Sequence, residues 1–247
     1  MRADRPFTAK MLEAYGLCPM KCRLYPLGDP SRGVARRVDA ARALHAAVKR
    51  ALDDCYRVGG PPALPSERLL EVFRSCFDGK ACADSREEDE CREAGVVMLR
   101  NYHADHVDDD VASVEVDVAL AGRIEDHPFQ ARAERREVRP DGRIVFVLYT
   151  TARRPPTEGV LEQDLRTGVL QLLGEQAEGR PVTIEVHALR TRRTLIATKP
   201  ADPLEEVRRR LVALATAVTE AEAFPTVRGR HCRWCHARGV CPEWGRR

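Results

Sequence analysis

Four cysteines stand near the two ends of this chain: Cys18, Cys232, Cys235 and Cys241. Thiolates bind soft or borderline metals, and a C-x2-C pair lets two sulfurs reach one centre from a single turn of backbone. We therefore expect a metal centre that joins the two ends of the chain. The residues alone leave a zinc site, with His231 and His236 as further candidate ligands, and an iron–sulfur cluster both open.

The other cysteines are expected to be ordinary thiols. The first ten residues, MRADRPFTAK, lack the apolar segment of a signal peptide, and no apolar run is long enough to cross a membrane. We therefore expect a cytoplasmic protein with no membrane attachment. In that reducing compartment, metal ligation or burial explains cysteines better than disulfides do. These remaining thiols are Cys22, Cys55, Cys76, Cys82 and Cys91.

Arginine is clustered although the net charge is only +3, which argues against a histone-like polycation. Guanidinium groups suit phosphates, and backbone contacts dominate nucleic-acid affinity, so these clusters are candidate phosphate contacts. The alternative is that they decorate solvated faces. The clusters lie within residues 36–50, 132–139, 190–193 and 208–210.

Hydrophobic periodicity and turn residues predict the elements that must position these groups. We expect helices over about 8–15, 36–56, 67–77, 91–103, 160–176 and 203–223, with Ser66 as the cap of the third. Strands are expected over 113–121, 129–138, 143–151, 182–189 and 194–198, and Pro140-Asp141-Gly142 is the turn of a hairpin. This order predicts an α/β or α+β core, with helices flanking a sheet.

Several motifs resemble those of the PD-(D/E)XK nuclease superfamily, in particular the RecB-like branch that includes the CRISPR-adaptation exonucleases. The opening Tyr15-Gly16-Leu17-Cys18-Pro19-Met20-Lys21 is similar to the start of that branch, and Cys232, Cys235 and Cys241-Pro242 are similar to its end. The resemblance implies that Cys18, Cys232, Cys235 and Cys241 hold a [4Fe-4S] cluster. It spans one domain, 1–247, with a helical part (1–110), a restriction-endonuclease-like sheet core (111–200), and a final helix with the cysteine tail (201–247).

The same resemblance places candidate metal ligands in the interior of the chain. It puts a metal-binding histidine at His45, a strand glutamate at Glu115, and the metal-binding aspartate at Glu134. The family's second carboxylate and lysine then fall on Leu148 and Thr150. The Gln-Leu-x-x-Tyr helix motif falls on Asp164-Leu165-Arg166-Thr167-Gly168.

Other placements of the acidic groups are open. Gly122-Arg123-Ile124-Glu125 is closer in letters to the family's metal-binding strand, but this match requires an inserted hairpin. A relocated carboxylate could also come from Glu137, from Asp141, or from the run Asp108-Asp109-Asp110 near His103 and His106. Tyr149 and Trp234 could stack on bases, although core or cluster packing is the ordinary role of such rings.

Hydrolysis by this family's chemistry needs carboxylates for Mg²⁺ or Mn²⁺ and a lysine beside the attacking water. Leucine supplies no ligand atom and threonine no charge, so we expect weak or absent Mg²⁺ or Mn²⁺ binding and no useful nuclease turnover. The expected function is binding of single-stranded DNA or DNA ends in repair, recombination or phage defence, alongside a helicase or nuclease partner. The alternatives are an active exonuclease with a relocated site, and an iron–sulfur protein-interaction scaffold without DNA binding.

Overall fold

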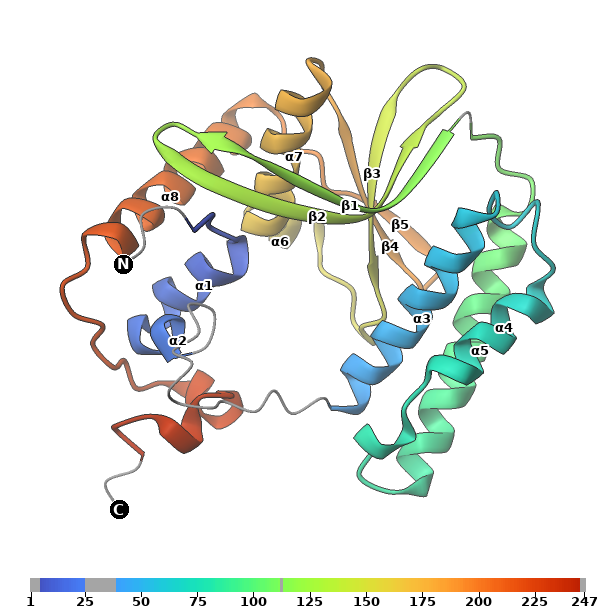
Figure 1. Ribbon diagram of the computed structural model, residues 1–247, viewed down its shortest axis with the longest axis horizontal. Coiled ribbons are helices and arrows are strands. Elements are labelled where there is room, and N and C mark those ends of the chain that lie inside the picture. Colours follow the sequence, from blue (N-terminus) through green and yellow to red (C-terminus); the bar gives the residue numbers. More distant parts are fainter. Residues whose placement is uncertain (1–4, 25–38, 112, 245–247) are drawn as a thin grey trace.

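Five strands form one mixed sheet in the computed structural model, which describes residues 5–24, 39–111 and 113–244. The strands are β1 (Ser113–Ile124), β2 (His127–Val138), β3 (Ile144–Thr150), β4 (Thr183–Ala188) and β5 (Arg193–Ile196). They lie side by side in chain order, and Figure 1 shows that β1 and β2 form one long hairpin. The neighbouring strands are antiparallel except β3 and β4, which run parallel.

Strand β3 is covered on both faces, and its sequence IVFVLYT explains why. Val145, Val147 and Tyr149 pack into one apolar cluster with the helices of residues 40–106. Ile144, Phe146 and Leu148 pack into another with the helices that follow β3. A strand without a polar face can only be a central strand.

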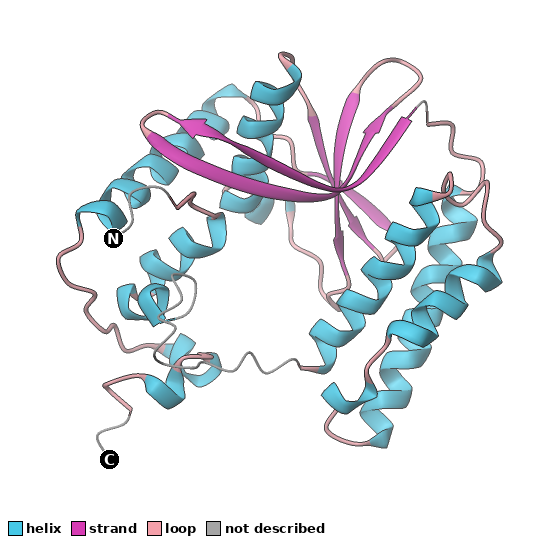
Figure 2. Ribbon diagram, viewed as in Figure 1, coloured by secondary structure: helices cyan, strands magenta, loops and turns pink. Residues whose placement is uncertain are grey.

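The helices form a layer on each side of the sheet (Figure 2). On one side lie α3 (Ala40–Arg57), α4 (Ser66–Cys76) and α5 (Ser85–His106). On the other lie α1 (Ala9–Leu17), α2 (Pro19–Leu24), α6 (Glu158–Glu162), α7 (Leu165–Glu178) and α8 (Ala201–Glu220). Short 3₁₀ helices occupy Gly79–Ala81, Arg230–Trp234 and Arg238–Val240. The predicted class, a mixed sheet flanked by helices, is confirmed.

Side-chain caps move some helix boundaries away from their predicted positions. Asp84 accepts a hydrogen bond from the Glu87 N–H at 2.8 Å, so α5 begins at Ser85, six residues before its predicted start at residue 91. Asp164 caps α7 through the Thr167 N–H, which divides the predicted helix 160–176 into α6 and α7. Ser66 is the first residue of α4 rather than its cap. The predicted start of α3, residues 36–38, lies outside the described residues.

The C-terminal segment lies beside α1 and α2, as the red and blue parts of Figure 1 show. The Met20 N–H donates to the Pro225 carbonyl at 3.1 Å, and the Val227 N–H donates to Cys18 Sγ at 3.4 Å. These contacts bring residues 209 positions apart into one small module. Among the described residues, no helix is long and apolar enough to span a membrane.

Candidate functional site

Glu134 lies at an irregularity in the β1–β2 ladder. The paired positions are Val116 with Arg135 and Val118 with Ala133, and Asp117 and Glu134 fall between them. Asp117 has a φ of 59°, in the left-handed region that aspartate tolerates better than most residues. Along β2, Ala133 packs toward α7 whereas Arg135 packs toward α3 and α5. The break in face alternation buries Glu134 between the two layers.

The carboxylate of Glu134 is held by an arginine of α7. Arg166 Nη2 lies 3.1 Å from Glu134 Oε1, whereas Oε2 is buried without a hydrogen-bond partner among the described residues. Burial raises the pKa of Glu134, and the positive charges of Arg166 and Lys49 oppose that rise. One oxygen of this carboxylate is therefore paired with a guanidinium group, and the other has no partner among the described residues.

Strand β3 carries the two substituted positions, and Leu148 lies level with Glu134 in the sheet. Leu148 follows Val147, the last β3 residue in the ladder with β2, and Glu134 precedes its partner Arg135. The Leu148 side chain is only 2% exposed and belongs to the apolar cluster under α7. Thr150, two residues further on, reaches the rim of an open cleft. The positions expected for the second carboxylate and the lysine therefore present a hydrocarbon and a hydroxyl group.

That cleft has a volume of about 790 Å³ and lies between α3, α5 and the end of β3. His45 lines it, and its Nδ1 lies 3.5 Å from the Thr151 hydroxyl. Burial lowers the pKa of His45, and the nearby charges of Arg166 and Lys49 lower it further. His45 and Glu134 thus share the same two cationic neighbours, which places them in one region of the molecule. Other charged side chains on the cleft wall are Arg42, Glu87, Glu90, Arg153 and Arg190.

Lys49, one helical turn after His45, was not singled out by the sequence patterns. Its Nζ lies 2.5 Å from Asp53 Oδ2 and 3.4 Å from Asp117 Oδ1. Asp53 is buried, which raises the pKa of its carboxyl group despite the Lys49 hydrogen bond. The spacing of His45, Lys49 and Asp53 at intervals of four residues on α3 is the available sequence signal, whereas Asp117 comes from β1.

The other candidate carboxylates lie elsewhere. Glu115 is exposed on β1 and pairs across the ladder with Arg136, whose side chain binds Glu178 on α7. Glu125 is exposed in the turn between β1 and β2. Asp141 is exposed in the β2–β3 turn, where it binds Arg143 at 2.5 Å, and Asp109 binds His106 Nδ1 at 2.6 Å.

Helix α7 has no room for the tyrosine of the Gln-Leu-x-x-Tyr pattern. Gly168 occupies its place, and a Cβ atom there would lie 2.4 Å from Val207 Cγ1 of α8. Contacts this short do not occur between packed atoms, so any side chain would displace α8. The close contact between α7 and α8 at Gly168 is therefore compatible with glycine and not with a tyrosine at this position.

The four cysteines of the termini line one small cavity of about 20 Å³, together with Lys21 and Trp244. Cys18 follows α1, and Cys232 and Cys235 flank the end of the 3₁₀ helix Arg230–Trp234. Burial raises the pKa of Cys235, and the charge of Lys21 opposes this. In the described ranges, no group of three or more histidine, cysteine, aspartate or glutamate side chains is arranged to hold a single metal ion. The four thiols nevertheless line one cavity, and thiolates are ligands that soft and borderline metals prefer.

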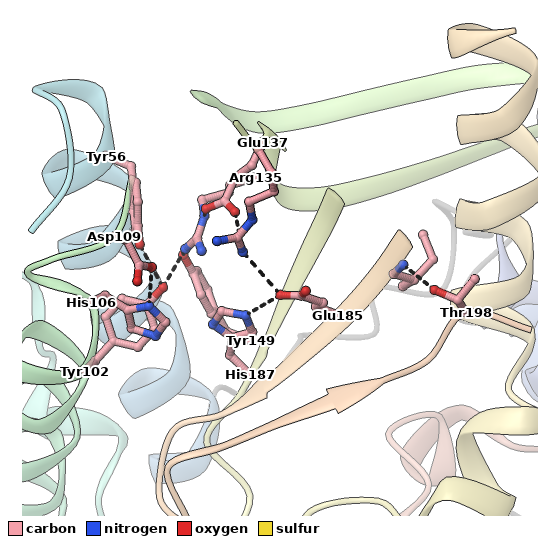
Figure 3. A network of polar contacts seen from close by, with 12 residues as sticks. Tyr56, Tyr102, His106, Asp109, Arg135, Glu137, Tyr149, Glu185, His187 and Thr198 are labelled. Atoms are coloured by element: carbon pink, nitrogen blue, oxygen red, sulfur yellow. Dashed lines mark hydrogen bonds and ion pairs between the residues drawn. The ribbon is translucent and has the colours of Figure 1, made fainter. Parts of the chain in front are cut away.

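A buried polar network that the sequence patterns did not indicate lies on the opposite face of β3 (Figure 3). Arg135, 1% exposed, forms an ion pair with Glu137 and hydrogen bonds to the hydroxyls of Tyr102 (2.6 Å) and Tyr149. Its guanidinium carbon lies 3.9 Å from the centre of the Tyr56 ring. The network joins β2 and β3 to α3 and α5, which fixes the strands that carry Glu134 and Leu148.

Comparison with known proteins agrees with this geometry. Residues 6–242 match the PD-(D/E)XK nuclease superfamily. The chain therefore belongs to this superfamily, and its mixed sheet between two helical layers is the restriction-endonuclease-like fold.

Two solved structures are similar to this chain at low sequence identity. A candidate exonuclease from Eubacterium rectale matches with a TM-score of 0.55 and 12% identity, over 93% of this chain and 86% of that chain. The structure of SSO0001 matches with a TM-score of 0.39 and 12% identity, over 89% of this chain and 98% of that chain. No curated protein has a matching sequence.

Proposed function

We propose that this protein is a DNA-binding member of the RecB-like branch whose nuclease centre has lost its catalytic capacity, and that it acts in DNA repair, recombination or phage defence. The observation that carries the proposal is the pairing of buried Glu134 with Arg166 beside buried Leu148. A divalent cation needs several oxygen ligands, and here one carboxylate faces a guanidinium while its expected partner is a hydrocarbon.

The charge balance of the site supports this proposal. Glu134 pairs with Arg166, Asp53 with Lys49, and Asp117 with both Lys49 and Arg132. The carboxylates are thus neutralised by side chains of the protein itself. A metal ion would have to displace these cations, which lowers its affinity. Residual Mg²⁺ or Mn²⁺ binding at His45 and the free oxygen of Glu134 is correspondingly weak.

DNA is the expected ligand because the superfamily acts on phosphodiesters and the cleft retains cationic walls. Arg42, Arg153 and Arg190 line it. Glu90, which lines it too, forms ion pairs with Arg86 and Arg153. Phosphate contacts of this kind make affinity fall steeply with salt.

A cleavage assay tests the loss of catalysis. Single-stranded and duplex DNA, labelled at the 5′ end, is incubated with an excess of protein and Mn²⁺, and the products are separated on a gel. We expect no degradation above background. Clear degradation that Glu134→Ala abolishes would reject the proposal, because an intact centre would then exist.

An active exonuclease with a relocated site is the second candidate, and Lys49 is the observation that favours it. Its ammonium group lies among Asp53, Asp117 and the region of Glu134, and so supplies the charge that Thr150 lacks. If cleavage occurs, this candidate requires that Lys49→Ala abolish it and that Lys80→Ala, at an exposed lysine of the Gly79–Ala81 turn, leave it unchanged.

The proposal includes a [4Fe-4S] cluster on Cys18, Cys232, Cys235 and Cys241. It is supported by the shared cavity and by the N–H group of Val227, which donates to Cys18 Sγ. Hydrogen bonds to sulfur are one of the means by which proteins tune such clusters. Protein prepared without oxygen should contain about four iron and four sulfide ions per chain and absorb visible light. If the protein instead contains stoichiometric zinc and no iron, the four cysteines form a zinc site and the proposed cluster is rejected.

A further inference from the structure

Trp234 is unusually exposed for a large aromatic side chain. Its side chain is 74% exposed, the highest value among the large hydrophobic residues of the described chain. This exposure excludes packing in the core, one of the two ordinary roles of such a ring. Indole rings carry a large apolar surface and an N–H donor, which is why tryptophan is enriched where proteins contact other molecules.

Two exposed arginines lie close to Trp234 in the sequence. Arg230 and Arg233 are exposed, and neither guanidinium forms an ion pair or hydrogen bond with the part of the chain that the structure describes. Residues 227–247 contain six arginines and one acidic residue, Glu243. Glu243 is bound by Arg228 at 3.1 Å, so it does not neutralise the other arginines near the ring.

The other tryptophan provides a contrast within the same segment. Trp244 lines the cysteine cavity, and the guanidinium carbon of Arg238 lies 4.1 Å from its ring centre. One of its ring faces is therefore covered, whereas Trp234 is open. The two rings differ in accessibility although they lie only ten positions apart.

The tail also contacts the wall of the cleft. Arg42 Nη2 lies 2.6 Å from His236 Nε2, and Arg42 lines the cleft beside His45. His236 is two residues from Trp234, so the exposed ring belongs to the segment that contacts the cleft wall.

We propose that Trp234, with Arg230 and Arg233, is a base-stacking site for single-stranded DNA that leaves the cleft. The inference rests on the DNA binding proposed above and names the form of DNA that this surface takes. An exposed ring stacks on any unpaired base and the arginines bind the adjoining phosphates, so recognition is independent of base sequence. Duplex DNA, with its bases already stacked, gains nothing from the ring.

Binding of a fluorescein-labelled dT20 strand at low salt, measured by anisotropy, tests the proposal. Trp234→Ala should weaken binding roughly 5- to 100-fold, which is the usual effect of losing one stacking ring, whereas Trp234→Phe should stay close to the native protein. Affinity for a blunt 20-base-pair duplex should not change. The slope of log affinity for dT20 against log salt concentration should be smaller in the Arg230→Ala, Arg233→Ala double variant. The expected reduction is the one that corresponds to about two lost phosphate contacts.

Fluorescence provides a readout that does not depend on truncating Trp234. In a Trp244→Phe protein, dT20 should quench the remaining tryptophan, and in the matched Trp234→Phe protein it should not. If the native protein binds no DNA, the proposed function itself fails. If it binds DNA but Trp234 is neither quenched nor needed for dT20 binding, the stacking site is rejected and the proposed function stands. The exposed ring would then be a contact for a protein partner. Equal losses for dT20 and duplex would also overturn it.

Discussion

At Glu134, burial and Arg166 act in opposite directions on the pKa of one carboxyl group. Burial favours the protonated form, and the guanidinium at 3.1 Å favours the charged form. The site therefore depends on an ion pair between β2 and α7, where an active nuclease would depend on a metal ion. Because Arg166 is half-exposed, solvent screens this pair and its net contribution is modest.

Replacing Arg166 by alanine should destabilise the protein in a pH-dependent way. The buried carboxylate loses its partner, so the folded-state pKa of Glu134 rises further above the unfolded value, and stability falls as pH rises through that pKa. We expect a loss of about 1–2 kcal/mol in the free energy of unfolding at pH 7.5, and a smaller loss at pH 5. Urea denaturation at both pH values measures it. The same change in a Glu134→Gln background should show no pH dependence; equal losses in both backgrounds would mean that the ion pair is unimportant.

Leu148→Asp should restore part of the metal affinity that the centre lacks. An aspartate in this apolar cluster costs several kcal/mol without a partner, and Mn²⁺ bound between it and Glu134 should offset part of that cost. Leu170→Asp is the matched control, since Leu170 is 1% exposed in the same cluster but lies on α7. We expect Mn²⁺ to raise the melting temperature of Leu148→Asp alone. An equal rise in both variants, or in neither, would show that Leu148 is not at the carboxylate position.

Residue types predicted the candidate positions of the site, but they did not predict the side chains that form ion pairs with these residues. Arg166 stood in an unassigned position of the helix motif, and only the fold brings it to Glu134, 32 positions away. The i, i+4 spacing of Lys49 and Asp53 on α3 could have indicated their ion pair, but the second carboxylate, Asp117, lies 68 positions away on β1. Exposure of Trp234 depends on how the tail folds against α1 and α2, which composition does not encode.

At the scale of elements, the β2–β3 hairpin and the helices beside it are held by the Arg135 network. It includes His187 of β4, whose Nε2 lies 3.1 Å from Glu185 Oε2 and whose ring stacks on His106 at 5.4 Å between centres. Burial lowers the pKa of His187, although Glu185 opposes this. Removing one member of such a network leaves its buried partners unsatisfied.

Stability should therefore fall in mild acid. Burial lowers the pKa of His187 and of His45 in the folded state. The unfolded chain therefore binds more protons below about pH 6.5, and the free energy of unfolding decreases as the pH is lowered. In urea titrations from pH 8 to pH 5, His187→Gln should flatten this slope, and the His45→Gln, His187→Gln double variant should flatten it further. An unchanged slope in the double variant would exclude these histidines as its cause.

Local chemistry made several elements predictable. The hairpin turn is fixed by Gly142, whose φ is 81° and whose N–H donates to the Arg139 carbonyl at 2.8 Å. The break between α6 and α7 was missed although Asp164 followed by Thr167 is a capping pattern, because apolar periodicity continues across it. The irregular pairing at Asp117 and Glu134 could not be predicted, since it depends on two strands meeting in one register.

At the scale of the whole molecule, the C-terminal segment that carries three of the cysteines packs against the N-terminal helices. The contact between Val227 and Cys18 spans 209 positions, and a bound metal group there would cross-link the folded state. The positions of the cysteines predicted this meeting of the ends. The identity of the metal group rests on the resemblance and on the proposal drawn from it.

Cys241→Ser should remove bound iron and lower the melting temperature by about 2–8 °C, because roughly 1–2 kcal/mol of cross-linking is lost in a chain of this size. Cys76→Ser is the control: Cys76 is exposed on α4 and far in sequence from the tail. Iron analysis and thermal denaturation under nitrogen measure both effects. Equal behaviour of the two variants would contradict a structural role for the tail thiols.

Binding of DNA without a metal ion and without cleavage is the property that most directly separates this protein from an active nuclease. Equilibrium anisotropy with a labelled single strand, in EDTA and then in Mn²⁺, measures it, with a gel of each sample to test whether the strand is intact. We predict one affinity in both buffers, falling steeply with added salt, and an intact strand throughout. Affinity that requires Mn²⁺, or a strand shortened in its presence, would contradict it.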